Sequence, residues 1–271
     1  MSAAGAYSSY ELMAVVVSRE LRHRDHAFIG LGTGGRAFAM AVGIPTVAIE
    51  LARRLHGYDV VAQYGVLFNP LVSEIPDSFA DPYLLDWAAE ARVPVETCLD
   101  MFRRGVVTVG FVSGAQVDVN GNVNSVCIGP HDRPKVRLTG AIAQTDHAAA
   151  AGRTIIVLEQ ARRSLVEHVD FISAVGQIEA PGGRKALGLR GGGPAKVVTD
   201  RAVFGFPDGS ARLALQSIHP GWSFQQVCAE TEFQLDPNSD IATTEPPTNE
   251  ELVCIRTEID PTGKLLGGRI L

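Results

Sequence analysis

The sequence predicts an α/β protein with an open, mostly parallel sheet that is flanked by helices and mixed at its edge. Three observations predict this class: strands and helices alternate early in the chain, strands follow one another more closely later, and several strands are continuous apolar runs. Such runs are typical of strands covered on both faces. The 271 residues show no internal repeat or long linker, so we expect a single domain over residues 1–271.

The N-terminal half predicts two helices and three strands. Apolar residues at helical spacing predict the first helix over Glu11–Arg22, with Ser8 and Ser9 available as caps. Pro45 suits the first turn of a second helix, Thr46–Leu55. The predicted strands of this half are the apolar runs His26–Leu31, Asp59–Val66 and Val106–Val112.

The C-terminal half predicts closely spaced strands and two short helices. The predicted strands are Thr154–Leu158, Ala195–Val198, Val203–Phe206 and Ala211–Ser217. The predicted helices are Phe224–Glu230 and Asn249–Glu258. The glycine-rich segment Pro181–Pro194 is predicted to be a mobile surface loop.

Composition argues against several classes of function. The formal net charge is −6 and no Lys/Arg cluster is longer than a pair, so the chain lacks the basic surface that binds nucleic acid. The four cysteines lie far apart, which favours free thiols, no metal site and a reducing, cytoplasmic compartment. The uncharged stretches Ala37–Ile49 and Val60–Ser73 are shorter than a membrane span, and the N-terminus lacks the layout of a signal peptide.

A glycine-rich turn follows the first predicted strand. Gly30–Gly35 fits the G-x-G-x-x-G pattern, which in dinucleotide sites is followed at once by a helix and later by an acidic residue at the end of the second strand. Glu50 has the right spacing but falls inside a predicted helix, and the second strand ends without a carboxylate. A turn that brings backbone amides to a ligand, or one that only reverses the chain, is favoured over a nicotinamide site.

Residues Asn120–Asn122 predict a β-hairpin between residues 116–119 and 123–126, and the bland interpretation is a surface hairpin without chemistry. The preceding Ser113–Ala115 is a small-residue bend at the end of a strand, where α/β proteins bind ligands. The seven histidines show no metal-binding pattern, and no G-x-S-x-G motif supports a Ser-His-Asp hydrolase.

Four segments carry a resemblance by their residues and their order. They are FVSGAQVDVNGNVNS (Phe111–Ser125), EHVDFIS (Glu167–Ser173), GGGPAKVVTDRAVFGF (Gly191–Phe206) and SIHPGWSFQQVCAETEFQL (Ser217–Leu235). Together they resemble the β subunit of family I CoA-transferases of the glutaconate CoA-transferase type. The later segment PPTNEELVCIRTEIDP (Pro246–Pro261) is similar to the β subunit of the related steroid ring-opening acyl-CoA hydrolases.

The resemblance implies the open α/β fold of CoA-transferases and NagB/RpiA-like proteins. It also implies an α partner subunit, in a heterodimer or heterotetramer, and an acyl-CoA substrate between the two subunits. We expect no permanently bound cofactor, since coenzyme A enters as part of the substrate. The residues expected to line the substrate site are Gly32, Thr33, Gly34, Ser113, Gly114, Ala115 and Asn122.

Residue 63 departs from the family pattern. In family transferases a glutamate near the end of the second strand attacks the acyl-CoA carbonyl and then carries CoA as a thioester, which requires an ionised carboxylate. The family's Glu-Ser-Gly-Val aligns with Gln63-Tyr64-Gly65-Val66, so the resemblance assigns Gln63 to the reaction centre. An amide donates a hydrogen bond to a carbonyl oxygen but forms no such thioester.

Three explanations of Gln63 stay open: a natural change to hydrolysis or another acyl-CoA reaction, a laboratory Glu→Gln substitution, and a shifted alignment in which Glu74 acts instead. The segment Thr139–Asp146 also replaces the family's glycine-rich loop, and its side chains are expected to narrow the pocket. Three functional hypotheses follow. The chain is a β subunit acting on a carboxylated acyl-CoA, a scaffold for a catalytic α subunit, or a nicotinamide-dependent oxidoreductase.

Overall fold

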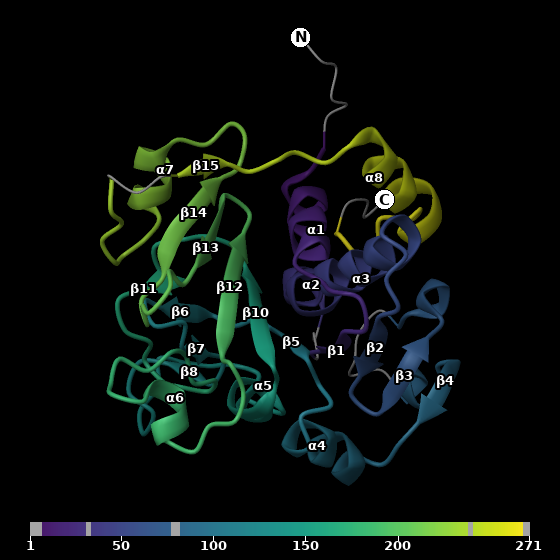
Figure 1. Cartoon of the computed structure of the whole chain (residues 1–271), viewed down its shortest axis with the longest axis horizontal. Helices are drawn as coiled ribbons and strands as arrows, with labels where there is room; N and C mark the ends of the chain where they lie inside the picture. The colour runs from purple at the N-terminus through teal and green to yellow at the C-terminus, as the bar shows by residue number, and fades with distance from the viewer. Residues whose placement is uncertain (1–6, 31–33, 77–81, 238–240, 268–271) are drawn as a thin grey trace. The chain divides into compact units, whose positions relative to one another are not determined.

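The computed structural model describes residues 7–30, 34–76, 82–237 and 241–267. The chain divides into two compact units. Unit 1 contains residues 1–100 and 246–271, and unit 2 contains residues 101–245. The C-terminal segment therefore returns to the unit formed by the first hundred residues (Figure 1). A single domain over residues 1–271 stays a prediction.

Two helices of unit 1 begin with reciprocal side-chain caps. α1 (Ser9–Arg19) follows Ser8, whose hydroxyl accepts from the Glu11 N–H at 3.1 Å, while the Glu11 carboxylate accepts from the Ser8 N–H at 2.7 Å. α8 (Asn249–Cys254) begins with the same motif, and a π-helical turn (Ile255–Ile259) extends it. Both predicted helices are confirmed.

The predicted helix over Thr46–Leu55 is the last part of a longer one. α2 (Gly35–Phe38), a π-helical turn (Ala39–Gly43) and α3 (Ile44–Leu55) follow one another without a break. Pro45 therefore lies in the first turn of α3, after the π-helical turn rather than at the start of the whole helix. A wider turn at this point is compatible with a proline, which has no N–H for the helical ladder.

This long helix, Gly35–Leu55, is the only one among the described residues that is long and apolar enough to cross a membrane, judged by length and composition. It extends beyond the uncharged stretch Ala37–Ile49 at both ends. Within unit 1 it is mostly buried, since 78% of its apolar window lies inside the protein. Gly43 permits close packing there, because a Cβ at this position would lie 1.8 Å from the Leu265 carbonyl oxygen.

The strands of unit 1 lie in the order β1–β2–β3–β4. β1 (His26–Ile29) and β2 (Val61–Tyr64) are parallel, whereas β3 (Leu67–Pro70) and β4 (Ala89–Arg92) add antiparallel pairs. Both strands predicted for this part are confirmed, each shorter than predicted. β3 and β4 were not predicted, and the Ala-Glu-Ala-Arg composition of the largely exposed β4 gives little strand signal.

Short helical segments complete unit 1 and lead into unit 2. Two 3₁₀ turns cover Val72–Glu74 and Pro82–Leu85. α4 (Val95–Arg103), which was not predicted, spans the boundary between the units in the sequence.

The main sheet portion of unit 2 has the strand order β15–β14–β13–β12–β10–β5. β5, β10 and β12 are parallel, β13 and β14 are antiparallel additions, and β15 runs parallel to β14. The strands are β5 (Val109–Val112), β10 (Arg153–Leu158), β12 (Pro194–Thr199), β13 (Ala202–Gly205), β14 (Ala214–Ile218) and β15 (Ala242–Thr243). The predicted class, parallel at first and mixed at the edge, is confirmed.

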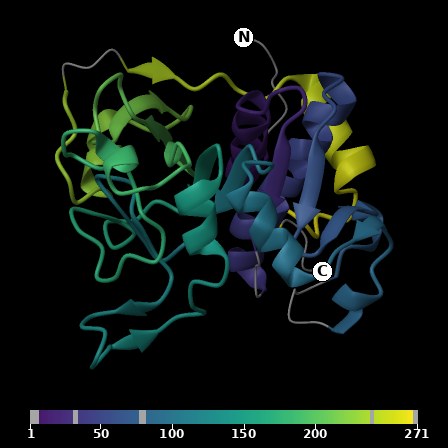
Figure 2. The same cartoon turned by 60° about the horizontal axis from the view of Figure 1, so that its bottom comes forward.

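A second, three-stranded sheet in unit 2 contains the predicted hairpin. β6 (Gln116–Asp118) pairs antiparallel with β7 (Val123–Asn124), and β11 (Leu165–Val166) runs parallel to β6. The hairpin is confirmed, but it is buried rather than a surface feature: its strand residues are 0–7% exposed. A separate hairpin of β8 (Cys127–Ile128) and β9 (Val136–Arg137) extends away from the rest of unit 2 (Figure 2, teal).

The helices of unit 2 are short. α7 (Phe224–Ala229) confirms a prediction and begins with a capping box, whereas α5 (Gln144–Ala150) and α6 (Gly183–Ala186) were not predicted. α6 is a single turn within Pro181–Pro194, so the segment lies largely at the surface as predicted but is not a loop throughout, and its mobility stays a prediction. The physical reason for the turn is Arg184, which is 7% exposed and hydrogen-bonds to the backbone carbonyls of Ala148, Val175, Gly176 and Gly191.

Candidate functional site

Gln63 lies near the end of β2 and is fully buried, with 0% of its surface exposed. Its neighbour Tyr64 points to the opposite face of the sheet, where its hydroxyl lies 2.8 Å from that of Thr46 on α3. The Oε1 atom of Gln63 lies 2.6 Å from Nε2 of His26, and its Nε2 atom donates to the Gly65 carbonyl at 2.9 Å. The residue assigned to the reaction centre is therefore held by strand β1 and by the turn after β2.

The groups around Gln63 favour their neutral forms. Burial lowers the pKa of His26, although its hydrogen bond to Gln63 acts in the opposite direction. Burial likewise raises the pKa of Cys98, whose thiol donates to the Gly65 carbonyl at 3.1 Å. The ring of Phe68 packs edge-on against His26 with centroids 5.6 Å apart. We call Gln63, His26, Gly65, Phe68 and Cys98 the Gln63 cluster; it contains hydrogen-bond donors, and its burial disfavours an ionised nucleophile.

The two glutamates weighed as alternatives lie elsewhere in unit 1. Glu74 ends the exposed 3₁₀ turn that begins at Val72. Glu50 lies within α3, as predicted, and its carboxylate pairs with Arg53 at 2.8 Å and with Arg54 at 3.2 Å. Glu50 is therefore engaged in ion pairs on its own helix.

The glycine-rich turn after β1 is described only in part. Gly32 and Thr33 lie outside the described residues. Gly34 directly precedes α2, and its φ of 149° belongs to the region that favours glycine. A helix thus follows the turn at once, but β2 ends at Tyr64 without the carboxylate that a nicotinamide site requires.

The bend Ser113–Ala115 follows β5 in unit 2 and is held against the hairpin. The Ala115 N–H donates to the Asn124 carbonyl at 2.8 Å. Gly114 approaches the same strand so closely that a Cβ would lie 2.4 Å from Cγ1 of Val123. The structure therefore brings Ser113, Gly114 and Ala115 together with β7, while Gln63 and Gly34 belong to unit 1.

A glutamine that the sequence analysis did not single out links this bend to two serines. Nε2 of Gln144 donates to the Ser113 carbonyl at 2.7 Å, and its Oε1 lies 2.6 Å from Oγ of Ser125 and 3.1 Å from Oγ of Ser173. Gln144 follows Ala143, whose φ of 60° is unusual for a residue other than glycine. We call Ser113, Ser125, Gln144 and Ser173 the serine–glutamine cluster. In the sequence, the feature that pointed to this cluster is the departure of Thr139–Asp146, which contains Gln144, from the family pattern.

Asn122, the last predicted substrate-lining residue, is engaged within the hairpin. Its Nδ2 donates to both carboxylate oxygens of Asp118, at 3.1 and 2.9 Å, and its Oδ1 accepts from the Gly176 N–H at 2.7 Å. These contacts give Asn122 a part in holding the hairpin, and its contact with substrate stays a prediction.

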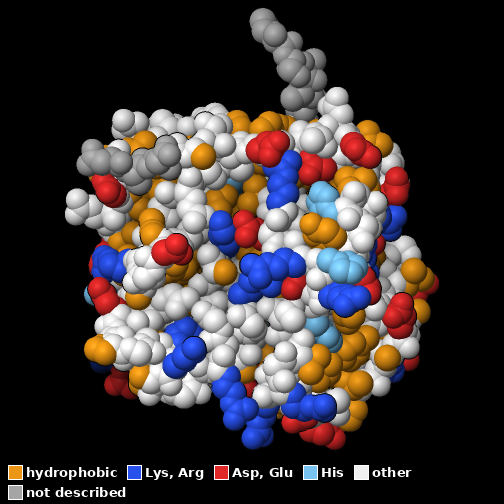
Figure 3. Space-filling model, in the orientation of Figure 1, with side chains coloured by type: hydrophobic (Ala, Val, Ile, Leu, Met, Phe, Trp, Pro, Cys, Tyr) orange, Lys and Arg blue, Asp and Glu red, His pale blue; other side chains and the backbone are white. Residues whose placement is uncertain are grey.

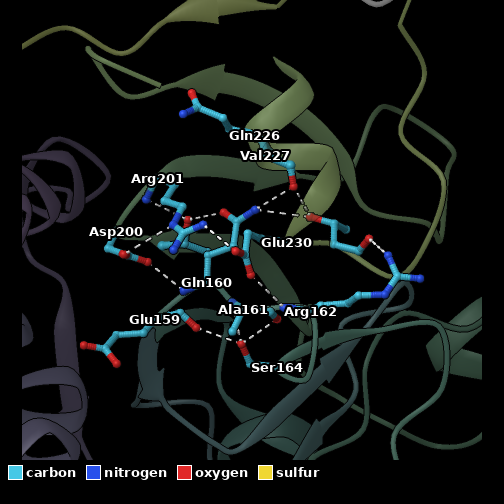
Figure 4. A network of polar contacts seen from close by, with 12 residues as sticks. Glu159, Gln160, Ala161, Arg162, Ser164, Asp200, Arg201, Gln226, Val227 and Glu230 are labelled. Carbon is cyan, nitrogen blue, oxygen red and sulfur yellow. Dashed lines mark hydrogen bonds and ion pairs between the residues drawn. The ribbon is translucent and has the colours of Figure 1, made fainter. Parts of the chain in front are cut away.

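Two of the segments that carry the family resemblance meet at Gln160 (Figure 4). The Gln160 N–H donates to Asp200 at 2.6 Å, and its side-chain Nε2 donates to the Val227 carbonyl at 3.1 Å. Arg201 pairs with Glu230 at 3.3 Å. These residues connect the ends of β10 and β12 to α7, so this part of the resemblance reflects a structural framework.

Charged side chains of both signs lie on the visible face of the protein. On the face shown in Figure 3, basic and acidic side chains are interspersed and do not form one basic field. Within the described ranges, no group of three His, Cys, Asp or Glu side chains is placed to hold a metal ion.

The fold is that of a subunit of the CoA-transferase class. The Coenzyme A transferase family matches residues 10–230, and the chain belongs to that family. It is similar to the β-type subunit of 3-oxoadipate CoA-transferase from Pseudomonas knackmussii, with 34% identity over 255 residues and 93% of both chains covered.

Two further comparisons agree. The crystal structure of glutaconate coenzyme A-transferase from Acidaminococcus fermentans superposes with a TM-score of 0.81 and 28% identity, covering 96% of this chain and 97% of that one. The cholesterol ring-cleaving hydrolase IpdB subunit of Rhodococcus jostii is 30% identical over 180 residues, covering 64% of this chain and 70% of that one. The resemblance and the fold class are confirmed: the chain is a β-type subunit of an enzyme of the CoA-transferase family.

Proposed function

We propose that this chain is the β subunit of a heteromeric enzyme that acts on a carboxylated acyl-CoA without covalent catalysis by residue 63. The observation that carries the proposal is Gln63, a buried neutral amide aligned with the glutamate of family transferases. The names of two relatives, 3-oxoadipate CoA-transferase and glutaconate CoA-transferase, support a dicarboxylic acyl group. The acyl-CoA and the α subunit enter the proposal through these relatives.

The chemistry of an amide sets the role of residue 63. CoA transfer through the protein needs an oxygen nucleophile that is ionised at neutral pH and is also a competent leaving group. An amide offers neither property. Its N–H groups instead stabilise the negative charge that develops on a thioester carbonyl oxygen during attack. We place the attacking group on the α subunit, which activates water and releases a carboxylic acid and CoA.

Two alternatives are each favoured by one observation. Similarity to the IpdB subunit, and the segment Pro246–Pro261, favour ring-opening hydrolysis of a steroid-derived acyl-CoA. The complete burial of Gln63 favours a scaffold role in which the α subunit carries all the chemistry. We place the protein in the cytoplasm under the proposed function and under both alternatives.

The experiment uses the complex of this chain with its α subunit. Glutaconyl-CoA and 3-oxoadipyl-CoA are incubated with and without acetate, and free CoA and acetyl-CoA are measured separately. We expect CoA release without an acceptor, and a fall in kcat/KM of about 100-fold for Gln63→Ala, which is typical of a lost oxyanion donor. Acetate-dependent formation of acetyl-CoA by the unchanged protein would contradict the proposal. Full turnover by Gln63→Ala would favour the scaffold.

A further inference from the structure

Two of the partners of Gln63 fix the orientation of its amide, and the third is the Cys98 thiol. The Gly65 carbonyl only accepts hydrogen bonds, so the group 2.9 Å from it is the NH₂ group of Gln63. The amide oxygen therefore faces His26 at 2.6 Å. Because that oxygen also only accepts, Nε2 of His26 must carry a proton, and neutral His26 is the Nε2–H tautomer.

The surroundings of residue 63 fit an amide better than a carboxylate. The Gly65 carbonyl already accepts from Gln63 and from the Cys98 thiol. A carboxylate at residue 63 would place a second acceptor against this carbonyl, in a position that is fully buried. Two acceptors facing each other without a donor are costly away from water. The site therefore supplies one donor, His26, and one acceptor, Gly65, which is the pattern an amide needs.

The sheet holds this arrangement in place. Phe28 pairs with Gln63 and His26 with Val61 in the parallel register of β1 and β2. His26 and Gln63 thus lie diagonally on neighbouring strands with their side chains on the same face. Since Phe68 of β3 packs on the imidazole, the ring has little freedom to turn away.

We infer that His26 is the positioning residue of Gln63, because its Nε2–H holds the amide oxygen. One amide N–H then meets the Gly65 carbonyl, and the other, which lies beside the Cys98 thiol, is the donor that residue 63 turns to a thioester carbonyl when substrate reaches this buried site. This inference rests on the proposed function, because the acceptor it names is the substrate's carbonyl oxygen. Its first part, the tautomer and the amide orientation, concerns only this chain.

The first test is spectroscopic and needs no substrate. The full-length chain is labelled with ¹⁵N-histidine, and the His26 signals are assigned by their loss in His26→Gln. We expect the Nε2–H tautomer near neutral pH, and a mixture of tautomers in Gln63→Leu, which removes the amide oxygen. An Nδ1–H tautomer in the unchanged protein would overturn the inference.

The second test is kinetic and uses the complex with the α subunit and glutaconyl-CoA. We expect His26→Ala to lower kcat by about ten- to 100-fold with KM within about twofold. The reason is that an amide N–H of Gln63 that is out of place stabilises the transition state less, while substrate binding changes little. His26→Gln, which keeps a side-chain N–H, should recover most of kcat. The exposed His56 provides the control, because His56→Ala should leave kcat unchanged.

The outcomes separate the two proposals. A folded His26→Ala protein with unchanged kcat, or a folded His26→Gln protein without recovery, would overturn the positioning role. A complex that releases no CoA from any tested acyl-CoA would overturn the proposed function, while the tautomer measurement would still decide the orientation of Gln63.

Discussion

The Gln63 cluster and the serine–glutamine cluster are both built around one glutamine, but they are held in different ways. Gln63 is fully buried and is bonded to a neighbouring strand and to the turn that follows its own. Gln144 is only half-buried and joins separate loops through Ser113, Ser125 and Ser173. The sheet therefore fixes the first arrangement, whereas the second depends on the glutamine itself.

The largest effect is expected in the buried Gln63 cluster. Gln63→Leu removes the amide but nearly keeps its volume, and it leaves the His26 N–H and the Gly65 carbonyl without this partner. We expect a loss of about 2–4 kcal/mol in unfolding free energy, since each buried polar group that loses its partner costs about 1–3 kcal/mol. Urea unfolding measures this loss of free energy, and Gln225→Leu, at an exposed glutamine, is the control. A loss of stability no larger than that of the control would contradict the hydrogen bonds of the Gln63 cluster.

A smaller loss is expected in the cluster of unit 2. Gln144→Ala removes three hydrogen bonds, but the half-buried position lets water replace part of them. We expect a loss of about 1–3 kcal/mol, and Gln225→Ala should change stability by less than about 0.5 kcal/mol. Because loops are joined here, amide hydrogen exchange should also rise in residues 113–115. Unchanged exchange in that bend would argue against Gln144 as its support.

The pH dependence of stability should come largely from unit 2. Burial lowers the pKa of both His147 and His219 to about 4 from 6.5. Between pH 6.5 and about 4 these histidines are protonated in the unfolded chain but neutral in the folded protein. Their contribution to the free energy of unfolding is therefore fully present above pH 6.5 and is lost as the pH drops toward 4. His219→Gln should remove one of these two protonation sites. The slope of the unfolding free energy against pH should then fall by up to about 1.4 kcal/mol per pH unit. Unfolding midpoints measured through this range would show an unchanged slope if His219 were charged in the fold.

The smallest effect concerns Asn122, whose amide is engaged inside the hairpin. Asn122→Ala should cost about 1 kcal/mol through the lost bonds to Asp118 and Gly176. The KM for acyl-CoA should stay within about twofold, because the Asn122 side chain is already engaged with Asp118 and Gly176. A tenfold rise in KM at unchanged stability would instead assign Asn122 to substrate binding, as the sequence predicted.

Local patterns predicted most of the framework. Apolar runs identified β1, β2, β5 and β10, and a serine cap identified α1. The segment Pro181–Pro194 lies largely at the surface as predicted, but its composition did not reveal its anchor, because Gly193 makes room for the buried guanidinium of Arg184. A Cβ on Gly193 would lie 2.8 Å from Arg184 Nε, a contact between residues that composition alone does not predict.

The candidate site was harder to predict because its contacts are long-range. Gln63 was found only through the family pattern, and nothing in the sequence indicates that His26, 37 residues earlier, lies against it. The strand register decides that contact. Likewise, the altered segment Thr139–Asp146 was noticed, but its link to Ser173 depends on how the loops fold together.

The central claim is that residue 63 takes no covalent part in the reaction, and intact-protein mass spectrometry tests it most directly. The complex with the α subunit is incubated with glutaconyl-CoA and quenched with acid. The intact mass of this chain is then measured, and the chain is digested for peptide analysis. We expect the unmodified mass. A CoA-sized increase on the peptide that contains residue 63 would contradict the account.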